Sequence, residues 1–315
     1  MNKWQKIGLI AGTGAAAVTI THIINQMIFT AAVRDGVTNT DNRLFYKWKF
    51  GNISYTRCGS GRPVLLVHDL NSSSNAYEWN IIQKELAKTY TVYAIDLLGC
   101  GYSEKPSITY TAYLYVQLLN DFVTNIIGKR TDIVATGGSA PLAIMACYNN
   151  SSLFDKIILV NPESIGAASR IPNKQSNALR ILLNIPVLGT ALYNLHMSRV
   201  HTVLRLKKAF YKESLITPEY ITAYHESSHL TGSAAKNIYI STTCHYTTAS
   251  IGRALSEINN CIYILAGDHE TEIDETIHDY LSVNPAIECA YVKDTGHLPQ
   301  LERPSRFMTQ LKIFL

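Results

Sequence analysis

The chain carries a histidine and two carboxylates in a setting that suits proton transfer. His297 lies in DTGHL, and both Asp268 and Glu270 lie in AGDHETEI, after an earlier apolar run. A histidine can take a proton from a nucleophile and return it later, while a carboxylate holds the ring in the required tautomer. Chemistry alone does not choose between Asp268 and Glu270, so both are candidates.

A candidate nucleophile lies in VATGGSAPLAIMA, residues 134–146, where a strand is expected to end and a helix to begin. Ser139 offers a hydroxyl, with Gly137 two residues before it, where a missing side chain permits a tight turn. In a competing register, Gly137 itself occupies the exposed position. The reactive atom would then be missing.

These residues require a scaffold of alternating strands and helices. From about residue 50, short apolar runs bounded by turn residues alternate with amphipathic stretches, which indicates an α/β fold with a mostly parallel sheet and flanking helices. The expected strands lie in 62–70, 90–96, 131–136, 154–162, 259–267 and 287–294.

The strand rhythm stops between residues 163 and 257, where the sequence is helix-like. Thr217 is a plausible N-cap with Pro218 at the first helical position. We expect a helical lid over 163–257, inserted into a core formed by 36–162 and 258–315.

The first 35 residues form a separate hydrophobic segment. Residues 7–33 are long enough to cross a bilayer as a helix, although His22, Asn25 and Gln26 interrupt the run on one face. We expect a membrane-associated helix here, with a cleaved signal peptide and an interfacial helix as alternatives. Without such an association, the protein is expected in the cytoplasm, and basic residues on both sides of the segment leave its orientation in a membrane open.

Composition excludes several classes of function. The net charge of +4 is spread along the chain, which gives no basis for nucleic-acid binding. The six cysteines form no CxxC pair and lack a histidine at zinc-ligand spacing, so no metal is expected. Neither a dinucleotide fingerprint nor a phosphate-binding loop is present, and no cofactor is expected.

Four stretches in order resemble the α/β-hydrolase family, in its lidded esterase, epoxide-hydrolase-like and lipase-like branch. They are VLLVHDL, DLLGCGYSEKP, ATGGSAPLA and TGHLPQLERP, and the resemblance covers residues 45–315. It implies a triad in the order nucleophile, acid, histidine. By this resemblance Ser139 is the nucleophile, Glu270 the acid and His297 the base, with Asp268 as the alternative acid.

The resemblance also implies an oxyanion hole, made by the backbone N–H of Ala140 and by another near Leu70. The sequence departs from the family at two points. Asp69 replaces the usual glycine after His68, and Pro141 replaces the last glycine of the elbow motif.

The expected function is therefore a serine hydrolase that acts on a carboxylic ester or a lipid-like acyl substrate through an acyl-enzyme. Acyl transfer uses the same intermediate and is one alternative. A catalytically inactive binding protein is the other, and it follows if Gly137 holds the nucleophile position.

Overall fold

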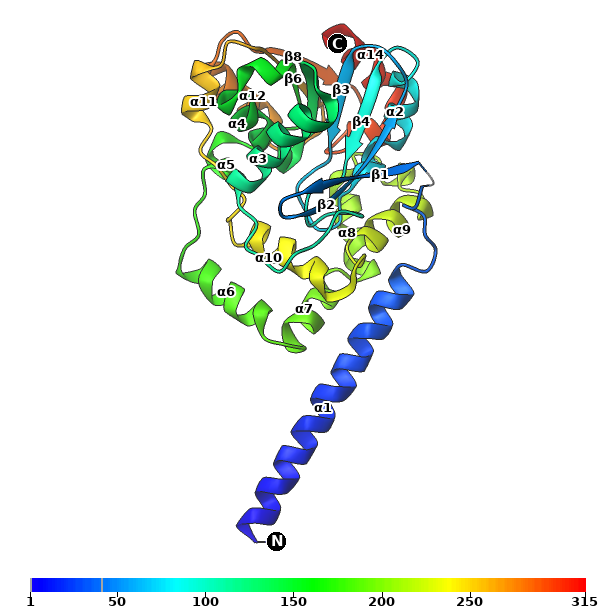
Figure 1. Ribbon diagram of the computed structural model, residues 1–315, viewed down its shortest axis with the longest axis vertical. Helices are drawn as coiled ribbons and strands as arrows, with labels where there is room; N and C mark the ends of the chain where they lie inside the picture. Colours follow the sequence, from blue (N-terminus) through cyan, green and yellow to red (C-terminus); the bar gives the residue numbers. More distant parts are fainter. Residues whose placement is uncertain (1, 41) are drawn as a thin grey trace.

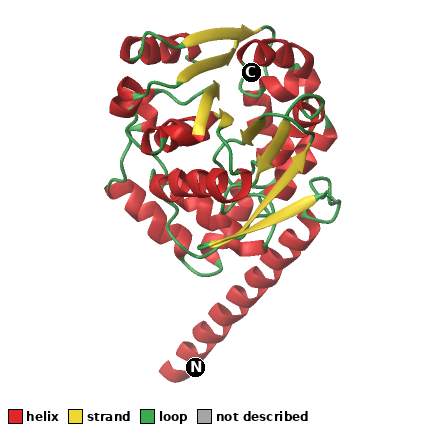
Figure 2. Cartoon of the chain, turned by 45° about the horizontal axis from the view of Figure 1, so that its top comes forward, coloured by secondary structure: helices red, strands yellow, loops and turns green. Residues whose placement is uncertain are grey.

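The structure, a computed structural model, describes residues 2–40 and 42–315. A twisted sheet runs through the middle of the molecule, with helices on both faces (Figures 1 and 2). The strand order is β1-β2-β4-β3-β5-β6-β7-β8. The strands are β1 (Arg43–Trp48), β2 (Gly51–Cys58), β3 (Pro63–Val67), β4 (Thr91–Ile95), β5 (Thr131–Thr136), β6 (Phe154–Val160), β7 (Cys261–Gly267) and β8 (Glu288–Val292).

Strands β3 to β8 are parallel, and β1 and β2 form an antiparallel hairpin that pairs with β4. The expected α/β fold with a mostly parallel sheet is confirmed. Because the carboxyl ends of parallel strands meet at one edge, the loops after β3, β5, β7 and β8 converge there. All the sequence-predicted site residues lie on these four loops or directly after them.

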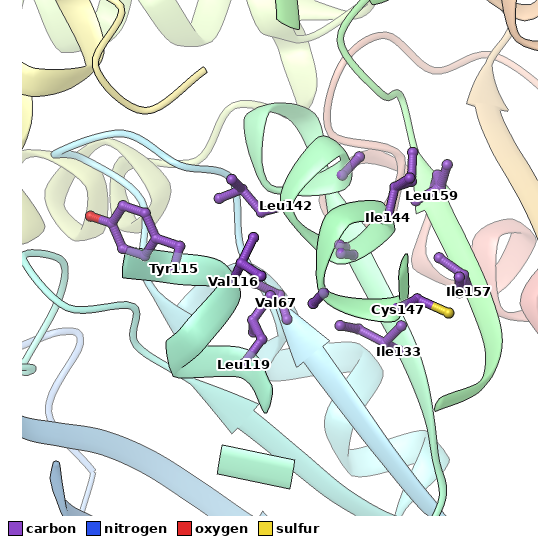
Figure 3. Packing of buried hydrophobic residues seen from close by; sticks show 14 of the residues in the cluster. Val67, Tyr115, Val116, Leu119, Ile133, Leu142, Ile144, Cys147, Ile157 and Leu159 are labelled. Carbon is purple, nitrogen blue, oxygen red and sulfur yellow. The ribbon is translucent and has the colours of Figure 1, made fainter. Parts of the chain in front are cut away.

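The core lies on both faces of the sheet, as the period of two along each strand requires. In β3, Val64 and Leu66 face one side, while Leu65 and Val67 face the other. Helices α2 (Asn80–Leu86) and α14 (Pro304–Phe314) cover the first face, and α3 (Ala112–Phe122), α4 (Ala140–Asn149) and α12 (Ile273–Val283) cover the second. Figure 3 shows the second face, where side chains of α3 and α4 pack on those of β3, β5 and β6.

Between β6 and β7 the chain forms only helices. They are α5 (Ile165–Ala168), α6 (Lys174–Asn184), α7 (Leu188–His196), α8 (Arg199–Ala209), α9 (Pro218–Ser227), α10 (Lys236–Thr243) and α11 (Gly252–Glu257). Helix α11 packs on α4 and α12, whereas α6 to α10 lie beyond the carboxyl edge of the sheet (Figure 1). We call residues 163–257 the helical insertion. A short helix, α13 (Pro299–Glu302), precedes α14.

Helix α1 (Lys3–Ala32) projects from the same end of the molecule as α6 and α7 (Figure 1). Its last third packs on the insertion: Phe29 lies in a buried cluster with Tyr193 and Met197. The side chain of Asn25, 2% exposed, donates to the carbonyl oxygen of Val187 at 3.1 Å and accepts from Asn194 at 3.0 Å. Asn25, which interrupts the apolar run, is therefore a buried contact with the insertion.

Asn161 fastens the end of β6 to the loop that carries His297. Its Nδ2 donates to the carbonyl oxygens of Gly296 and His297, both at 2.9 Å, and its Oδ1 accepts from the N–H of Gly267 at 2.8 Å. The residue is buried and has φ of 42°, a conformation that asparagine tolerates better than most residues. Gly267 is equally constrained, since a Cβ there would lie 2.1 Å from the carbonyl oxygen of Gly296.

We expect Asn161→Asp to lower the free energy of unfolding by about 2–3 kcal/mol, because a carboxylate oxygen would face two buried carbonyl oxygens. The control is Asn125→Asp at an exposed site, where the amide bonds a tyrosine hydroxyl, and there the expected change is below about 0.5 kcal/mol. Urea denaturation measures both, and equal effects would contradict the role given to Asn161.

Candidate active site

The turn between β5 and α4 is made by Gly137. Its φ is +53°, and a Cβ built on it would lie 2.3 Å from Oδ1 of Asp69. Both the backbone conformation and the occupied space exclude an ordinary side chain there. The structure therefore favours the register in which Gly137, and not Ser139, stands at the sharp turn.

Ser139 lies at the start of α4, and its side chain is fully buried. Its Oγ donates a hydrogen bond to the carbonyl oxygen of His68 at 2.5 Å. This bond joins α4 to the loop after β3 and directs the hydroxyl to the backbone. The Ser139 hydroxyl thus bonds the backbone carbonyl oxygen of His68, whereas the sequence led us to expect the imidazole of His297 as its partner.

Asp69 fills the space opposite the turn. Its Oδ1 accepts from the backbone N–H of Gly138 at 2.7 Å and from that of Leu70 at 2.8 Å, and its Oδ2 accepts from Nδ2 of Asn71 at 2.7 Å. The amide of Asn71 is oriented by its own Oδ1, which accepts from the N–H groups of Ser73 and Ser74. Three donors therefore hold the carboxylate in one position.

The N–H groups expected to form the oxyanion hole are only partly those that the structure presents. The N–H of Leu70 donates to Oδ1 of Asp69, the oxygen that also accepts from Gly138 in the turn after β5. The N–H of Ala140 donates instead to the carbonyl oxygen of Gly137 and closes the 3₁₀ turn Gly137–Ser139. The N–H of Gly138 is the one that donates to Asp69. Both donors, Leu70 and Gly138, are occupied by the same oxygen of Asp69.

His297 stands between two carboxylates. Its Nδ1 lies 3.0 Å from Oε1 of Glu270, and its Nε2 lies 4.0 Å from Oδ2 of Asp69. Asp268, the alternative acid, accepts from the N–H of Thr295 at 3.2 Å and so stabilises the loop rather than the imidazole. The structure brings Glu270, His297 and Asp69 together in one line.

The charges around His297 decide its protonation. Burial lowers the pKa of this partly exposed imidazole, but the hydrogen bond and charge of Glu270, with the charges of Asp69 and Glu78, outweigh burial and raise the pKa to about 9. A pKa of about 9 makes His297 an imidazolium at neutral pH, and its Nε2 lies 4.0 Å from Oδ2 of the Asp69 carboxylate.

Glu78 is a second carboxylate that sequence reasoning missed. It is buried, accepts from the N–H of Asp69 at 3.1 Å and from the hydroxyl of Tyr224 at 3.0 Å, and its pKa is raised to about 7 by burial and by the charge of Asp69. No motif marks Glu78 in the sequence. What the sequence did show was Asp69 in place of the usual glycine, which marks the loop that Glu78 supports.

The helical insertion and the core together position His297. Its backbone N–H donates to the carbonyl oxygen of Ala209 at the end of α8, and the carboxylate of Glu302 bridges the N–H groups of Gly296 and Tyr211. The backbone that carries the imidazole is therefore held from three sides: by the end of β6 through Asn161, by α8 through Ala209, and by α13 through Glu302.

A cavity of about 290 Å³ opens over these groups. Asp69, Glu78 and His297 of the core line this cavity, and the insertion contributes lining residues from α7 to α10, including Met197, Arg205, Leu206, Tyr224 and Tyr239. Within residues 2–40 and 42–315 no group of histidine, cysteine and acidic side chains has metal-binding geometry. The arrangement presents the carboxyl groups of Asp69 and Glu78 and the imidazolium of His297 to a small, mostly apolar space.

We expect Gly137→Ala to destabilise the protein by about 2–4 kcal/mol, because the methyl group must displace the Asp69 carboxylate in addition to adopting a positive φ. Gly128→Ala is the matched control: Gly128 has φ of +66° with open space around its Cβ, so only the conformational cost of about 1 kcal/mol remains. When Gly137→Ala is introduced into a protein that already carries Asp69→Gly, its additional cost in unfolding free energy should be close to that of the control. A cost that is unchanged by Asp69→Gly would contradict the contact.

The raised pKa of His297 predicts a pH-dependent stability. The folded protein binds the proton more tightly than the unfolded chain, so the contribution is complete below pH 6.5 and is lost as the pH rises to about 9. We expect the destabilisation caused by His297→Gln to decrease by on the order of 2 kcal/mol across this window. Urea denaturation at pH 6 and at pH 9.5 tests this; a difference that grows with pH would refute it.

Comparisons with known proteins agree with this architecture. A model of the alpha/beta hydrolase family matches residues 64–310. A soluble epoxide hydrolase of Corynebacterium sp. is 24% identical over 271 residues, which cover 82% of this chain and 92% of that protein. An uncharacterized protein of Mycobacterium tuberculosis is 23% identical over 272 residues, covering 82% of this chain and 76% of that protein.

Solved structures show the same fold. A serine hydrolase involved in carbazole degradation superposes with a TM-score of 0.71 at 16% identity, over 86% of this chain and 97% of that chain. A membrane phospholipase A superposes with a TM-score of 0.68 at 17% identity, over 99% of this chain and 98% of that chain. The similar proteins of known activity named here are hydrolases, and the family match extends from β3 to α14. This chain belongs to the alpha/beta hydrolase family.

Proposed function

We propose that the protein is a hydrolase in which the Asp69 carboxylate is the nucleophile, in place of the side chain that Gly137 lacks. His297 transfers protons and Glu270 orients it, while the helical insertion acts as the lid of the site. The substrate class is a small molecule with an electrophilic saturated carbon, of which an epoxide is the simplest.

One observation carries this proposal: Oδ1 of Asp69 is held by the N–H groups of Gly138 and Leu70, while Oδ2 lies 4.0 Å from Nε2 of His297. The same observation disfavours acyl chemistry at Ser139. An ester carbonyl attacked by a serine needs free donors for its developing oxyanion, and both donors are already used. The hydroxyl of Ser139 is also bound to the backbone.

In the first step, Oδ2 of Asp69 attacks a carbon of the epoxide and forms an ester, and the carbon–oxygen bond of the ring breaks. The ring oxygen takes the proton from Nε2 of His297, which becomes neutral. A histidine with a pKa of about 9 carries this proton at neutral pH, so the ion pair is poised for this step.

In the second step, neutral His297 takes a proton from water while the water oxygen attacks the Cγ of Asp69. The negative charge develops on Oδ1, within reach of the N–H groups of Gly138 and Leu70. The intermediate collapses by breaking the Cγ–Oδ2 ester bond, and His297 protonates the departing alcohol. Loss of the remaining acid proton to His297 regenerates the carboxylate and the imidazolium, and the sum is epoxide plus water to diol.

The comparisons and the cavity support this substrate class. The epoxide hydrolase of Corynebacterium matches this chain over most of both lengths. The cavity has room for a small apolar molecule, and both the proposed acid, His297, and the proposed nucleophile, Asp69, line it.

A single turnover in water labelled with heavy oxygen tests the proposal. With styrene oxide as the probe and enzyme in excess, the label should appear in the peptide that contains Asp69 and be absent from the diol. One oxygen of the diol is the former ring oxygen, and the other comes from Oδ2 of Asp69. Mass spectrometry of the digest measures this. Label found only in the diol would refute a covalent carboxylate intermediate.

Paired variants separate the alternatives. We expect Asp69→Asn to lower kcat/KM by about 10³-fold or more, and Ser139→Ala to leave it within about threefold. If Ser139→Ala alone abolishes hydrolysis of p-nitrophenyl butyrate, the serine mechanism replaces ours. If the wild type hydrolyses neither probe, the Glu270–His297–Asp69 line is a structural ion pair, and the fold serves binding.

We further propose that α1 is retained as a membrane anchor. Gly12–Ala32 is long and apolar enough to cross a bilayer, and 11% of its most apolar stretch is buried within the protein. A signal sequence passes the same test, but removal of α1 would expose the pocket that Phe29 fills and break the contacts of Asn25. The membrane phospholipase A aligns with 99% of this chain, which also supports retention.

A further inference from the structure

The exposed face of α6 is unusual for a surface helix. Ala178, Ile181, Leu182 and Ile185 recur at i, i+3, i+4 and i+7, the spacing of an apolar stripe that normally packs on a core. Here all four residues are exposed. Leu188, directly after the α6–α7 turn, is exposed as well. This amphipathic helix therefore presents its apolar stripe outwards, and we call these five residues the α6 stripe.

The positive charge is not spread evenly along the chain, as the total suggested, but is concentrated in the segment that contains α6. Residues 164–212 contain eight lysines and arginines and no acidic residue, although the whole chain carries only +4. The rest of the chain therefore has a net charge of −4. Lys174 lies on the same helical face as the α6 stripe, four residues before Ala178, and is exposed. An apolar stripe flanked by cations favours an anionic lipid surface and disfavours a second copy of the same face.

The position of α1 shows where such a surface would lie. Asn25 of α1 bonds the carbonyl oxygen of Val187 in the α6–α7 turn, so this turn touches α1 at a fixed level. Because α1 packs on the insertion from Asn25 onwards, the part of the helix that is free to cross a bilayer is the part before it. From Trp4 to Asn25 the helix rises about 32 Å, close to the thickness of the hydrocarbon core of a bilayer. A bilayer crossed by this part of α1 therefore ends at the level of the α6–α7 turn.

We propose that the α6 stripe lies on the surface of a bilayer that contains anionic lipids, and that it forms a second membrane contact beside α1. The inference rests on the retention of α1 but not on the reaction at Asp69. It orients the helical insertion, whose α7 and α8 line the cavity, against the membrane.

Fluorescent probes in the full-length protein test this contact. A solvatochromic probe is attached at Ile181→Cys, with Ile313→Cys as the matched control. The two isoleucines are 66% and 68% exposed, and they belong to α6 and α14, which lie at opposite ends of the folded body (Figure 1). The background variant carries Cys261→Ser, which removes the exposed native thiol. The protein is reconstituted into vesicles of phosphatidylcholine with or without phosphatidylglycerol.

In vesicles with phosphatidylglycerol, we expect the probe at Ile181 to gain at least about twofold in intensity and to be quenched by spin-labelled lipid. The probe at Ile313 should respond only to aqueous iodide. Lys174→Glu combined with Ala178→Glu should abolish lipid quenching at a probe on Ile181, while vesicle flotation, which reports α1, persists.

Three results would overturn the proposal. The first is equal iodide quenching at both sites in floating vesicles, which leaves α1 as an anchor and removes the α6 contact. The second is protection of Ile181 without lipid quenching, accompanied by a dimer in sedimentation, which assigns the stripe to a second copy. The third is failure of the protein to float with the vesicles.

Discussion

The carboxylate of Asp69 receives the N–H groups of Gly138 and Leu70 at the point where the chain turns from β5 into α4, and the rest of the site depends on this contact. A side chain at residue 137 would collide with it, so the turn must be glycine. The negative charge of Asp69 also adds to that of Glu270 and keeps His297 protonated. A loop residue thus determines the turn, the charge of the imidazole and the use of the two backbone donors.

Much of the fold could be predicted from the sequence, because buried parallel strands are continuous apolar runs with clear turn signals. All six strands expected from such runs are present. The hairpin of β1 and β2 was missed, since its residues are partly exposed and carry Arg43, Lys47 and Arg57 among the aromatic side chains. Their pairing with β4 depends on a neighbour distant in sequence, which local pattern does not reveal.

Of the candidate site, the contact between His297 and Glu270 could be predicted from the sequence, whereas the positions of Ser139 and Asp69 could not. His297 and Glu270 are adjacent because a strand end fixes each of them. Ser139 and Gly137 differ by two positions in one short loop, and only the backbone conformation separates the two registers. Asp69 was visible as a departure from the family pattern, but its reach into the turn depends on loop conformation. Glu78 carries no sequence signal, because an isolated acidic residue within a helical segment is ordinarily solvated.

The buried hydroxyl of Ser139 has a practical consequence for how proteins of this kind are found. Phosphonate reagents that report active serines need both an accessible oxygen and unoccupied backbone donors. The hydroxyl of Ser139 is buried, and the N–H groups of Leu70 and Gly138 are bound to Asp69. Surveys by such reagents, or by searching for a serine between two glycines, would pass over it. A search that pairs an elbow glycine with an acidic residue one loop away would recover it and any chain built in the same manner.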